Sequence, residues 1–165
     1  MQDDVPRTEA LLSQGANVNS RQENRILLVA ALVDNHLGTA RVLLRFHPDV
    51  NAVNPNSGLT ALECACAWGA KDIVETLVAR DADINAHAVE GTSALSVAAH
   101  GGRADLVSYL LAHGAYIHLV DSHGKTPLMV TQRRYDDTLD PKKKARIFSV
   151  LTLLQKAENE KPLGP

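Results

Sequence analysis

The stretch GLTALECACAWGAKDIVETLVARDADINA at residues 58–86 recurs 33 positions later as GTSALSVAAHGGRADLVSYLLAHGAYIHL at residues 91–119. Both copies place leucine and alanine at matching positions, and each has an isoleucine followed by a polar residue just before its last position. A self-similar period of this length is typical of arrays in which each unit buries the apolar faces of its neighbours. The sequence therefore predicts stacked units that present a surface, and it argues against a single enclosed active site.

The period extends in both directions along the chain. Helices are predicted to open at positions spaced by 34, 33 and 33 residues, namely Ile26, Thr60, Ser93 and Thr126. Small or apolar residues that complete an i, i+3 stripe follow at Ala31, Ala65, Ala98 and Thr131, and a second helix carries the pairs at residues 43–44, 77–78, 110–111 and 153–154. Each unit is thus predicted to be a helix, a turn, a second helix and an extended loop.

Turn residues punctuate the pattern at fixed places. Glycines fall midway between units and after the first helix of a unit, where a tight turn needs positive φ. Asn24 and Asn35 take two of these places, and asparagine tolerates positive φ better than most residues. His47 and Asp81 stand where glycine would end the second helix, at a cost of up to about 1 kcal/mol each.

These residues carry a resemblance to the ankyrin repeat family. Its members open with D-x-x-G-x-T-P-L-H-x-A-A-x-x-G, which DSHGKTPL at 121–128 matches best, and close with L-L-x-x-G-A-D-V-N. The closing motif is matched by GANVN at 15–19, PDVN at 48–51, DADIN at 81–85 and GAYIH at 114–118. The resemblance covers about Pro6 to Leu154. It implies an all-α ankyrin-repeat solenoid of stacked helix-turn-helix units joined by hairpin-like loops.

The units expected from this alignment are complete only in the middle of the chain. Residues 1–20 form an incomplete repeat with a second helix and its loop, and repeats follow at 21–53, 54–86 and 87–119. Asp4 is expected to cap the first helix, and Pro6 to lie in its first turn. We expect this half-repeat to result from cutting a longer array, and a makeshift cap is the alternative; in either case the Leu11–Leu12 flank lacks a partner.

The last unit departs from the pattern after Thr131. Residues 120–157 are predicted to form a capping repeat with an inserted loop of about ten residues, because terminal units of an array need a polar outer side. Asp140 and Pro141 suit the start of a helix that reaches about Lys156, and residues 158–165 are expected to be a tail.

Composition limits the classes of partner. The net charge of −2 argues against a surface that holds nucleic acid, and no apolar run reaches membrane-spanning length. Cys64 and Cys66 point about 200° apart on one helix, so we expect reduced, packed thiols and a cytoplasmic protein. The basic stretch PKKKAR at 141–146 raises import into the nucleus as an alternative, although three lysines can also simply solvate a loop.

Catalytic patterns are absent from the sequence. It contains no nucleophile elbow, phosphate-binding glycine loop, HExxH or CxxC, and its seven histidines fall in different units. Carboxylates in RRYDDTLD, residues 133–140, could lie near a ligand, but loops of mixed charge are usually only solvated. We therefore expect no enzymatic activity, no cofactor and no metal.

The resemblance also implies where a partner would dock. In ankyrin proteins the partner usually contacts the concave side, made of loop tips and the exposed part of each first helix. The corresponding candidate positions are Arg25, Val33, Asp34, Asn56, Leu59, Trp68, Val89, Glu90, His100, His123, Lys125, Arg133 and Arg134.

Trp68 is the most informative of these candidates. It is the only tryptophan, and the neighbouring units place Asp34 and Gly101 at its position, so the fold does not require its burial. Tryptophan and arginine are enriched among binding hot spots. A contact with a partner and a ring packed over Leu59 remain equal alternatives.

The closing asparagines have a structural and a chemical interpretation. In the family, Asn19, Asn51 and Asn85 would brace the loops through hydrogen bonds to neighbouring backbone. Similar asparagines in animal ankyrin proteins, with a leucine eight residues earlier as here, can also be hydroxylated.

Together these observations predict a monomeric module that binds a protein partner, as an adaptor or a stoichiometric inhibitor. The alternative is a structural spacer within a longer array that has no partner of its own.

Overall fold

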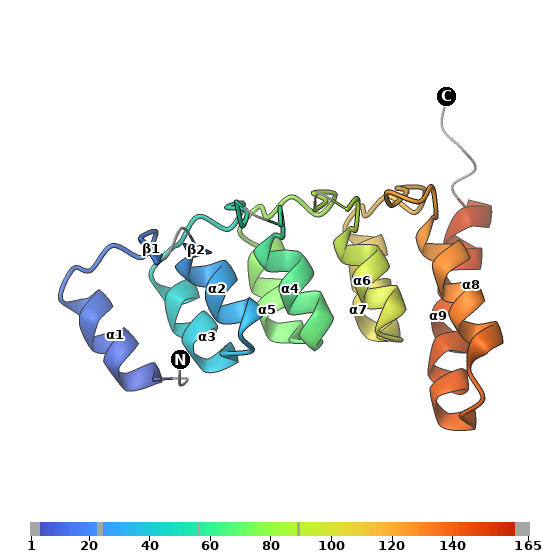
Figure 1. The fold of residues 1–165 in the computed structure, drawn as a ribbon, viewed down its shortest axis with the longest axis horizontal. Helices are drawn as coiled ribbons and strands as arrows, with labels where there is room; N and C mark the ends of the chain where they lie inside the picture. The colour runs from blue at the N-terminus through green and yellow to red at the C-terminus, as the bar shows by residue number, and fades with distance from the viewer. Residues whose placement is uncertain (1–3, 23–24, 56, 89, 161–165) are drawn as a thin grey trace. The chain divides into compact units, whose positions relative to one another are not determined.

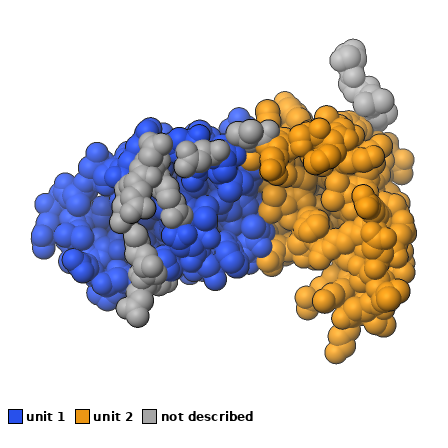
Figure 2. All heavy atoms as spheres, in the orientation of Figure 1, with its two compact units in different colours: residues 1–83 blue, residues 84–165 orange. Residues whose placement is uncertain are grey.

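The computed structural model describes residues 4–22, 25–55, 57–88 and 90–160, and within them the chain is an all-α repeat fold (Figure 1). It divides into two compact units, residues 1–83 and 84–165, which are described separately (Figure 2). Asn24, Asn56 and Val89, three positions singled out in the sequence, lie outside the described residues.

Unit 1 consists of two rows of short helices. α2 (Leu27–Val33) and α4 (Ala61–Trp68) pack side by side in one row, and α1 (Val5–Ser13), α3 (Leu37–Arg45) and α5 (Lys71–Val78) pack in sequence in the other. A two-residue antiparallel pair, β1 (Arg21–Gln22) and β2 (Arg25–Ile26), precedes α2. The leucines of the repeat pattern fill the space between the rows, as expected for helices that are apolar on one face.

Unit 2 repeats this arrangement with longer final helices. α6 (Ala94–His100) packs against α8 (Pro127–Asp137), and α7 (Ala104–Ala112) packs against α9 (Pro141–Glu160). Leu95, Leu106, Leu110, Ile147 and Leu154 are almost fully buried between them. In Figure 1 the loop that leads into α8 lies at one end of these helices, and the α8–α9 turn lies at the other.

The predicted helix openings are confirmed. Ile26, Thr60, Ser93 and Thr126 are the N-cap residues of α2, α4, α6 and α8, and all but Ile26 accept a hydrogen bond from a backbone N–H of the first turn. Thr60 forms a capping box with Glu63, whose carboxylate accepts the Thr60 N–H at 2.9 Å. Such a cap contributes about 1 kcal/mol to stability.

The expected left-handed turns are also confirmed. Asn35, His47 and Asp81 have φ values of 59°, 54° and 61°, like the glycines at equivalent places. The sequence pattern therefore located these strained positions even where glycine is absent.

The closing asparagines brace the loops, as expected. Asn51 donates to the Asp81 carbonyl at 3.0 Å and accepts from the Asp83 N–H at 2.7 Å. Asn85 makes the equivalent pair of bonds to Gly114 and Tyr116, at 3.1 and 2.8 Å. Each asparagine thereby ties its own loop to the next one along the chain.

At both ends of the chain the structure differs from the sequence prediction. Most of the inserted residues of the last repeat are helical, because α8 continues to Asp137 and α9 begins at Pro141, and only residues 138–140 form a loop. α9 ends at Glu160, beyond the predicted Lys156, so residues 158–160 belong to the helix and not to a tail. At the other end, Asp4 caps α1 as predicted, and Leu12 is buried because α1 packs on α3; Leu11 is 49% exposed.

The two cysteines are free and buried, which confirms packed thiols. Burial, with a smaller contribution from the neighbouring Glu63 charge, raises the pKa of the Cys64 thiol to about 12. Cys64 is therefore almost entirely protonated at neutral pH and a poor nucleophile.

Candidate protein-binding surfaces

Three of the unit 1 candidates gather at the C-terminal end of α2. Val33 is 37% exposed and Asp34 is the exposed C-cap residue of that helix. Trp68, at the end of α4, reaches the same place, because its Nε1–H donates to the Leu32 carbonyl at 2.6 Å. Three candidate side chains from two consecutive repeats thus lie around one helix end.

The hydrogen bond of Trp68 was not foreseen from the sequence. The Leu32 carbonyl also accepts the Asn35 N–H at 3.2 Å in the turn after α2, so the indole N–H adds a further hydrogen bond to this helix end. The side chain is nevertheless 44% exposed. Trp68 therefore has a structural role in joining two repeats, and much of its surface remains available to a partner.

The other unit 1 candidates are less informative. Leu59 is half-buried at the loop tip, where its carbonyl accepts the Asn54 N–H at 2.9 Å. Arg25 pairs through its backbone with Gln22 in the two-residue hairpin.

In unit 2 the candidate loop tip at residues 121–125 is ordered by one carboxylate. Asp121 Oδ1 accepts the backbone N–H of His123 at 2.8 Å and that of Lys125 at 2.9 Å. These bonds, that of Lys125 first, hold the pKa of Asp121 below its ordinary value of 3.8. The exposed side chains of His123 and Lys125 therefore project from a fixed backbone.

Two successive loop tips of unit 2 are in direct contact. The Ser122 N–H donates to the carbonyl of Glu90, another candidate, at 2.9 Å. A Cβ atom placed on Gly91 would lie 3.0 Å from the Asp121 Cα and 3.1 Å from the Ser122 nitrogen. Glycine is thus required here both by its φ of 72° and by the closeness of the next backbone.

The three candidates on α6 and α8 have different environments. Partial burial lowers the pKa of His100 below its ordinary value of 6.5, and the charge of the nearby Arg134 lowers it further. Arg133 instead points toward Asp137, with Nε and Oδ2 3.8 Å apart, and is largely exposed. Arg134 is half-buried, and its Nη1 has no hydrogen-bond partner among the described residues. Arg133 and Arg134 are adjacent in the sequence, but their side chains point to different neighbours, Asp137 and His100.

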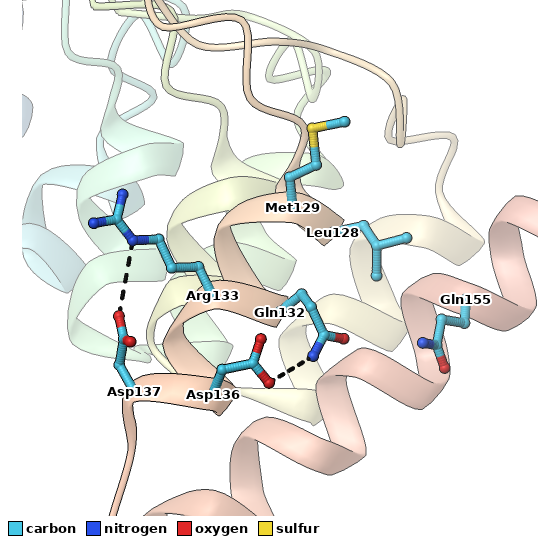
Figure 3. Close-up of a pocket in the computed structure, with 7 residues that line it drawn as sticks. All are labelled: Leu128, Met129, Gln132, Arg133, Asp136, Asp137 and Gln155. Carbon is cyan, nitrogen blue, oxygen red and sulfur yellow. Dashed lines mark hydrogen bonds and ion pairs between the residues drawn. The ribbon is translucent and has the colours of Figure 1, made fainter.

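A shallow groove along α8 was missed by the sequence pattern. It has a volume of about 560 Å³ and is lined by Leu128, Met129, Gln132, Arg133, Asp136, Asp137 and Gln155 (Figure 3). Gln132 Nε2 donates to Asp136 Oδ1 at 3.0 Å, and Arg133 Nε lies 3.8 Å from Asp137 Oδ2. Most of the polar side chains that line the groove therefore already pair with one another. Met129, an apolar residue of this lining, is 54% exposed.

Two other kinds of site are not found in the described part of the chain. It contains no group of three or more His, Cys, Asp or Glu side chains placed to hold a metal ion. None of its helices is both long and apolar enough to cross a membrane.

Comparison with known proteins agrees with the repeat geometry. The family model described as "Ankyrin repeats (3 copies)" matches residues 2–88, and "Ankyrin repeats (many copies)" matches residues 77–129. The chain is 34% identical over 134 residues to the ankyrin repeat protein YahD of Escherichia coli, which covers 76% of this chain and 66% of YahD. It is 40% identical over 89 residues to the E3 ubiquitin-protein ligase Ufd4 of Drosophila melanogaster, and 36% identical over 93 residues to the mouse B-cell lymphoma 3 protein homolog.

These relatives are longer than the matched segment. The matches span 54% of this chain but 3% of Ufd4, and 56% of this chain but 21% of the mouse protein. From the period, the caps, the braced loops and these matches, the chain belongs to the ankyrin repeat family.

Proposed function

We propose that this protein is a binding module for another protein, acting as an adaptor or a stoichiometric inhibitor. Ankyrin repeats generally mediate protein–protein interactions, and the family is typically non-enzymatic. The observation that carries the proposal is Trp68, whose ring is held in place by its own hydrogen bond and is still 44% exposed. We expect a cytoplasmic monomer without a cofactor.

A fixed aromatic side chain is well suited to recognition. Binding costs free energy for each side chain that is immobilised, about 0.5–1.5 kcal/mol, and Trp68 has already met this cost through its bond to Leu32. Val33 and Asp34 add an apolar and a charged contact beside it. A hot-spot cluster of this kind, surrounded by a wider contact area of about 800 Å² per partner, is typical of specific interfaces.

The loop tip of unit 2 is a second candidate contact. The Asp121 carboxylate fixes the backbone beneath His123 and Lys125, so a partner would meet these side chains without having to order the loop. Glu90 lies on the neighbouring tip and adds the opposite charge.

Partner capture with three variants tests the proposal. The partner is identified by affinity purification with the full chain and confirmed as a stoichiometric complex by light scattering. Trp68→Ala should weaken the complex about tenfold or more, whereas Trp68→Phe, which keeps an aromatic ring, should weaken it less. Leu11→Ala removes another exposed apolar side chain, one outside the candidate surface, and should leave binding unchanged.

The same experiment, extended to Lys125→Ala at the unit 2 loop tip, distinguishes the spacer alternative. A spacer forms no stoichiometric complex with any protein, and its variants change only stability. A partner that binds Trp68→Ala and Lys125→Ala as tightly as the original chain would show that the proposed surfaces are wrong.

A further inference from the structure

The turn between α6 and α7 is approached by cationic side chains from three helices of unit 2. His100 is the last residue of α6, and the charge of Arg134 on α8 adds to burial in lowering the His100 pKa, so the two side chains lie near each other. Arg146 of α9 lies beside the same turn, because a Cβ atom built on Gly102 would be 3.7 Å from the Arg146 Cβ. In Figure 1 this turn and the α8–α9 turn lie at the same end of unit 2. The packing of the helices thus gathers these cations from residues far apart in the sequence.

The guanidinium of Arg134 has an unused donor at this place. Its Nη1 is buried and has no hydrogen-bond partner among the described residues, although the residue as a whole is half-buried and part of it remains accessible. Buried polar atoms are hydrogen-bonded with few exceptions, and a buried charged donor without a partner is especially costly. The fold therefore keeps Arg134 in a position that an external acceptor would improve.

Arg134 does not serve as the cap of α6. Backbone N–H groups of residues 101–103 already donate to the carbonyls of residues 97–99, at 2.9, 3.0 and 3.1 Å. In unit 1, Trp68 occupies the same register two periods earlier and donates to the Leu32 carbonyl of the preceding repeat. Arg134 Nη1 makes no equivalent bond. A role in joining the repeats therefore does not account for this side chain.

The cations near the turn lack a counter-charge within the described part of the chain. No carboxylate there forms an ion pair with His100, Arg134 or Arg146. Lys142 and Lys143 lie one helical turn before Arg146 on the same side of α9 and add to the positive charge. Like charges that are gathered without a counter-charge repel one another, so an anion bound among them would relieve the repulsion.

We propose that the α6–α7 turn of unit 2 binds a phosphate group through His100, Arg134 and Arg146. A phosphate group carries about −1.5 to −2 charge at neutral pH and has acceptor oxygens on several sides, so it can accept from donors on three different helices. A carboxylate has two oxygens in one plane and is better matched to a single guanidinium.

This inference goes beyond the proposed function, because the site needs no protein partner. The phosphate group can belong to a phosphorylated side chain of another protein or to a small phosphate compound, and the chemistry of recognition is the same. The Trp68 surface in unit 1 takes no part in it.

Titration of the full chain with inorganic phosphate, followed by NMR at an ionic strength held constant with chloride, tests the inference. The backbone amide signals of residues 100–103 and the ring signals of His100 should shift and reach saturation. Arg134→Gln and Arg146→Gln should each weaken the binding about tenfold, as expected for the loss of one charge-assisted hydrogen bond.

A matched control separates the site from general charge effects. Lys156→Gln removes the same charge from the same helix, but it lies ten residues, about 15 Å along the axis, from Arg146. It should leave the affinity for phosphate unchanged.

Thermal unfolding of Arg134→Gln separates binding from folding. Without phosphate this variant should melt at or above the temperature of the original chain, because it removes a charge that has a buried, unpartnered donor. Added phosphate should raise the melting temperature of the original chain more than that of the variant, since a ligand stabilises the folded state in proportion to its binding.

Two further ligands identify the source of the phosphate group. A short peptide with one phosphoserine is compared with its unphosphorylated form, and adenosine monophosphate represents small phosphate esters. Tighter binding of the phosphopeptide than of inorganic phosphate would assign the site to a phosphorylated partner. Tighter binding of adenosine monophosphate would assign it to a small compound, and equal binding of all three to the free ion.

Three results would overturn the proposal. These are signals that shift no more with phosphate than with chloride, an affinity that is unchanged in Arg134→Gln and Arg146→Gln, and a loss of stability in Arg134→Gln without phosphate, which would make Arg134 a structural residue. None of them bears on capture of a partner through Trp68, so the two proposals fail independently.

Discussion

The two units join their repeats by different means. In unit 1, side chains of one repeat bond to helix-end carbonyls of the repeat before it: Trp68 donates to Leu32, and Arg80 Nη1 donates to Leu44. In unit 2, the backbone at Gly91 instead packs directly on residues 121–122. The hydrogen bonds of the closing asparagines are common to both units, so the repeat pattern specifies this connection. The second connection between repeats depends on the particular residues of each unit.

This difference predicts which changes each unit tolerates. A join made by side chains weakens in steps as atoms are removed, whereas a join made by close backbones fails as soon as a Cβ atom is added. Substitutions at Gly91 and Trp68 should therefore differ in size and in their dependence on the residue introduced.

The largest effect is expected for Gly91→Ala. The left-handed conformation costs about 1–2 kcal/mol for a residue with a Cβ atom. The clash with Asp121 and Ser122 backbone adds about 1–3 kcal/mol, because neither can move without disturbing the tip. Urea unfolding followed by circular dichroism should show a loss of about 2–5 kcal/mol.

Gly124→Ala is the matched control for this prediction. Gly124 has a φ of 69°, close to the 72° of Gly91, but no atom lies within 4 Å of a Cβ built on it. Its substitution should cost only the conformational part, about 1–2 kcal/mol. Equal losses in both variants would show that close approach of the two tips contributes nothing.

At Trp68 a graded loss is expected. Trp68→Phe keeps an aromatic ring but leaves the Leu32 carbonyl without the indole donor, which should cost about 1 kcal/mol. Trp68→Ala also removes the buried half of the ring and should cost about 2 kcal/mol. The free energies of unfolding should rank in that order, and no loss in Trp68→Phe would mean that the hydrogen bond does not stabilise the join.

Much of the fold followed from the sequence because each repeat solves the same local problems. Thr60 and Ser93 were recognised as N-caps, and Asp81 as a left-handed residue, since the register of the repeat points to them whatever their identity. Asn51 and Asn85 were likewise expected to brace the loops.

The candidate surfaces were less predictable, for a physical reason. Whether Trp68 contacts Leu32 depends on how one helix pair is offset from the next, and the sequence of a single repeat does not encode that offset. The sequence pattern predicts a loop at residues 133–141, because the insertion there breaks the period. The residues of RRYDD are nevertheless compatible with a helix, and Tyr135 is held there by contacts with Lys144 and Phe148 from α9.

A smaller effect of opposite sign is expected at the start of α9. Lys142→Glu/Lys143→Glu replaces two cations in the first turn by anions, each change contributing about 0.3–1 kcal/mol in favour of the helix. Thermal unfolding should therefore show a more stable protein at low salt, and the gain should diminish as salt screens the charges. A stability loss would show that these lysines contribute to the fold.

The smallest effect concerns the ion pair that links α3 and α5 of unit 1. Arg41 Nε and Nη2 donate to Asp72 at 2.6 and 3.2 Å, and this bond holds the pKa of Asp72 below its ordinary value of 3.8. Both side chains are about half exposed, so the pair contributes about 0.2–1 kcal/mol.

A group with a lowered folded pKa stabilises the protein above its unfolded pKa, and the contribution is lost as the pH falls through the folded value. Arg41→Gln should therefore lower stability at pH 7 and have almost no effect well below pH 3.8, while an NMR titration shows the Asp72 pKa returning toward 3.8. A stability difference that is the same at both pH values would show that Arg41 stabilises unit 1 through packing and not through its charge.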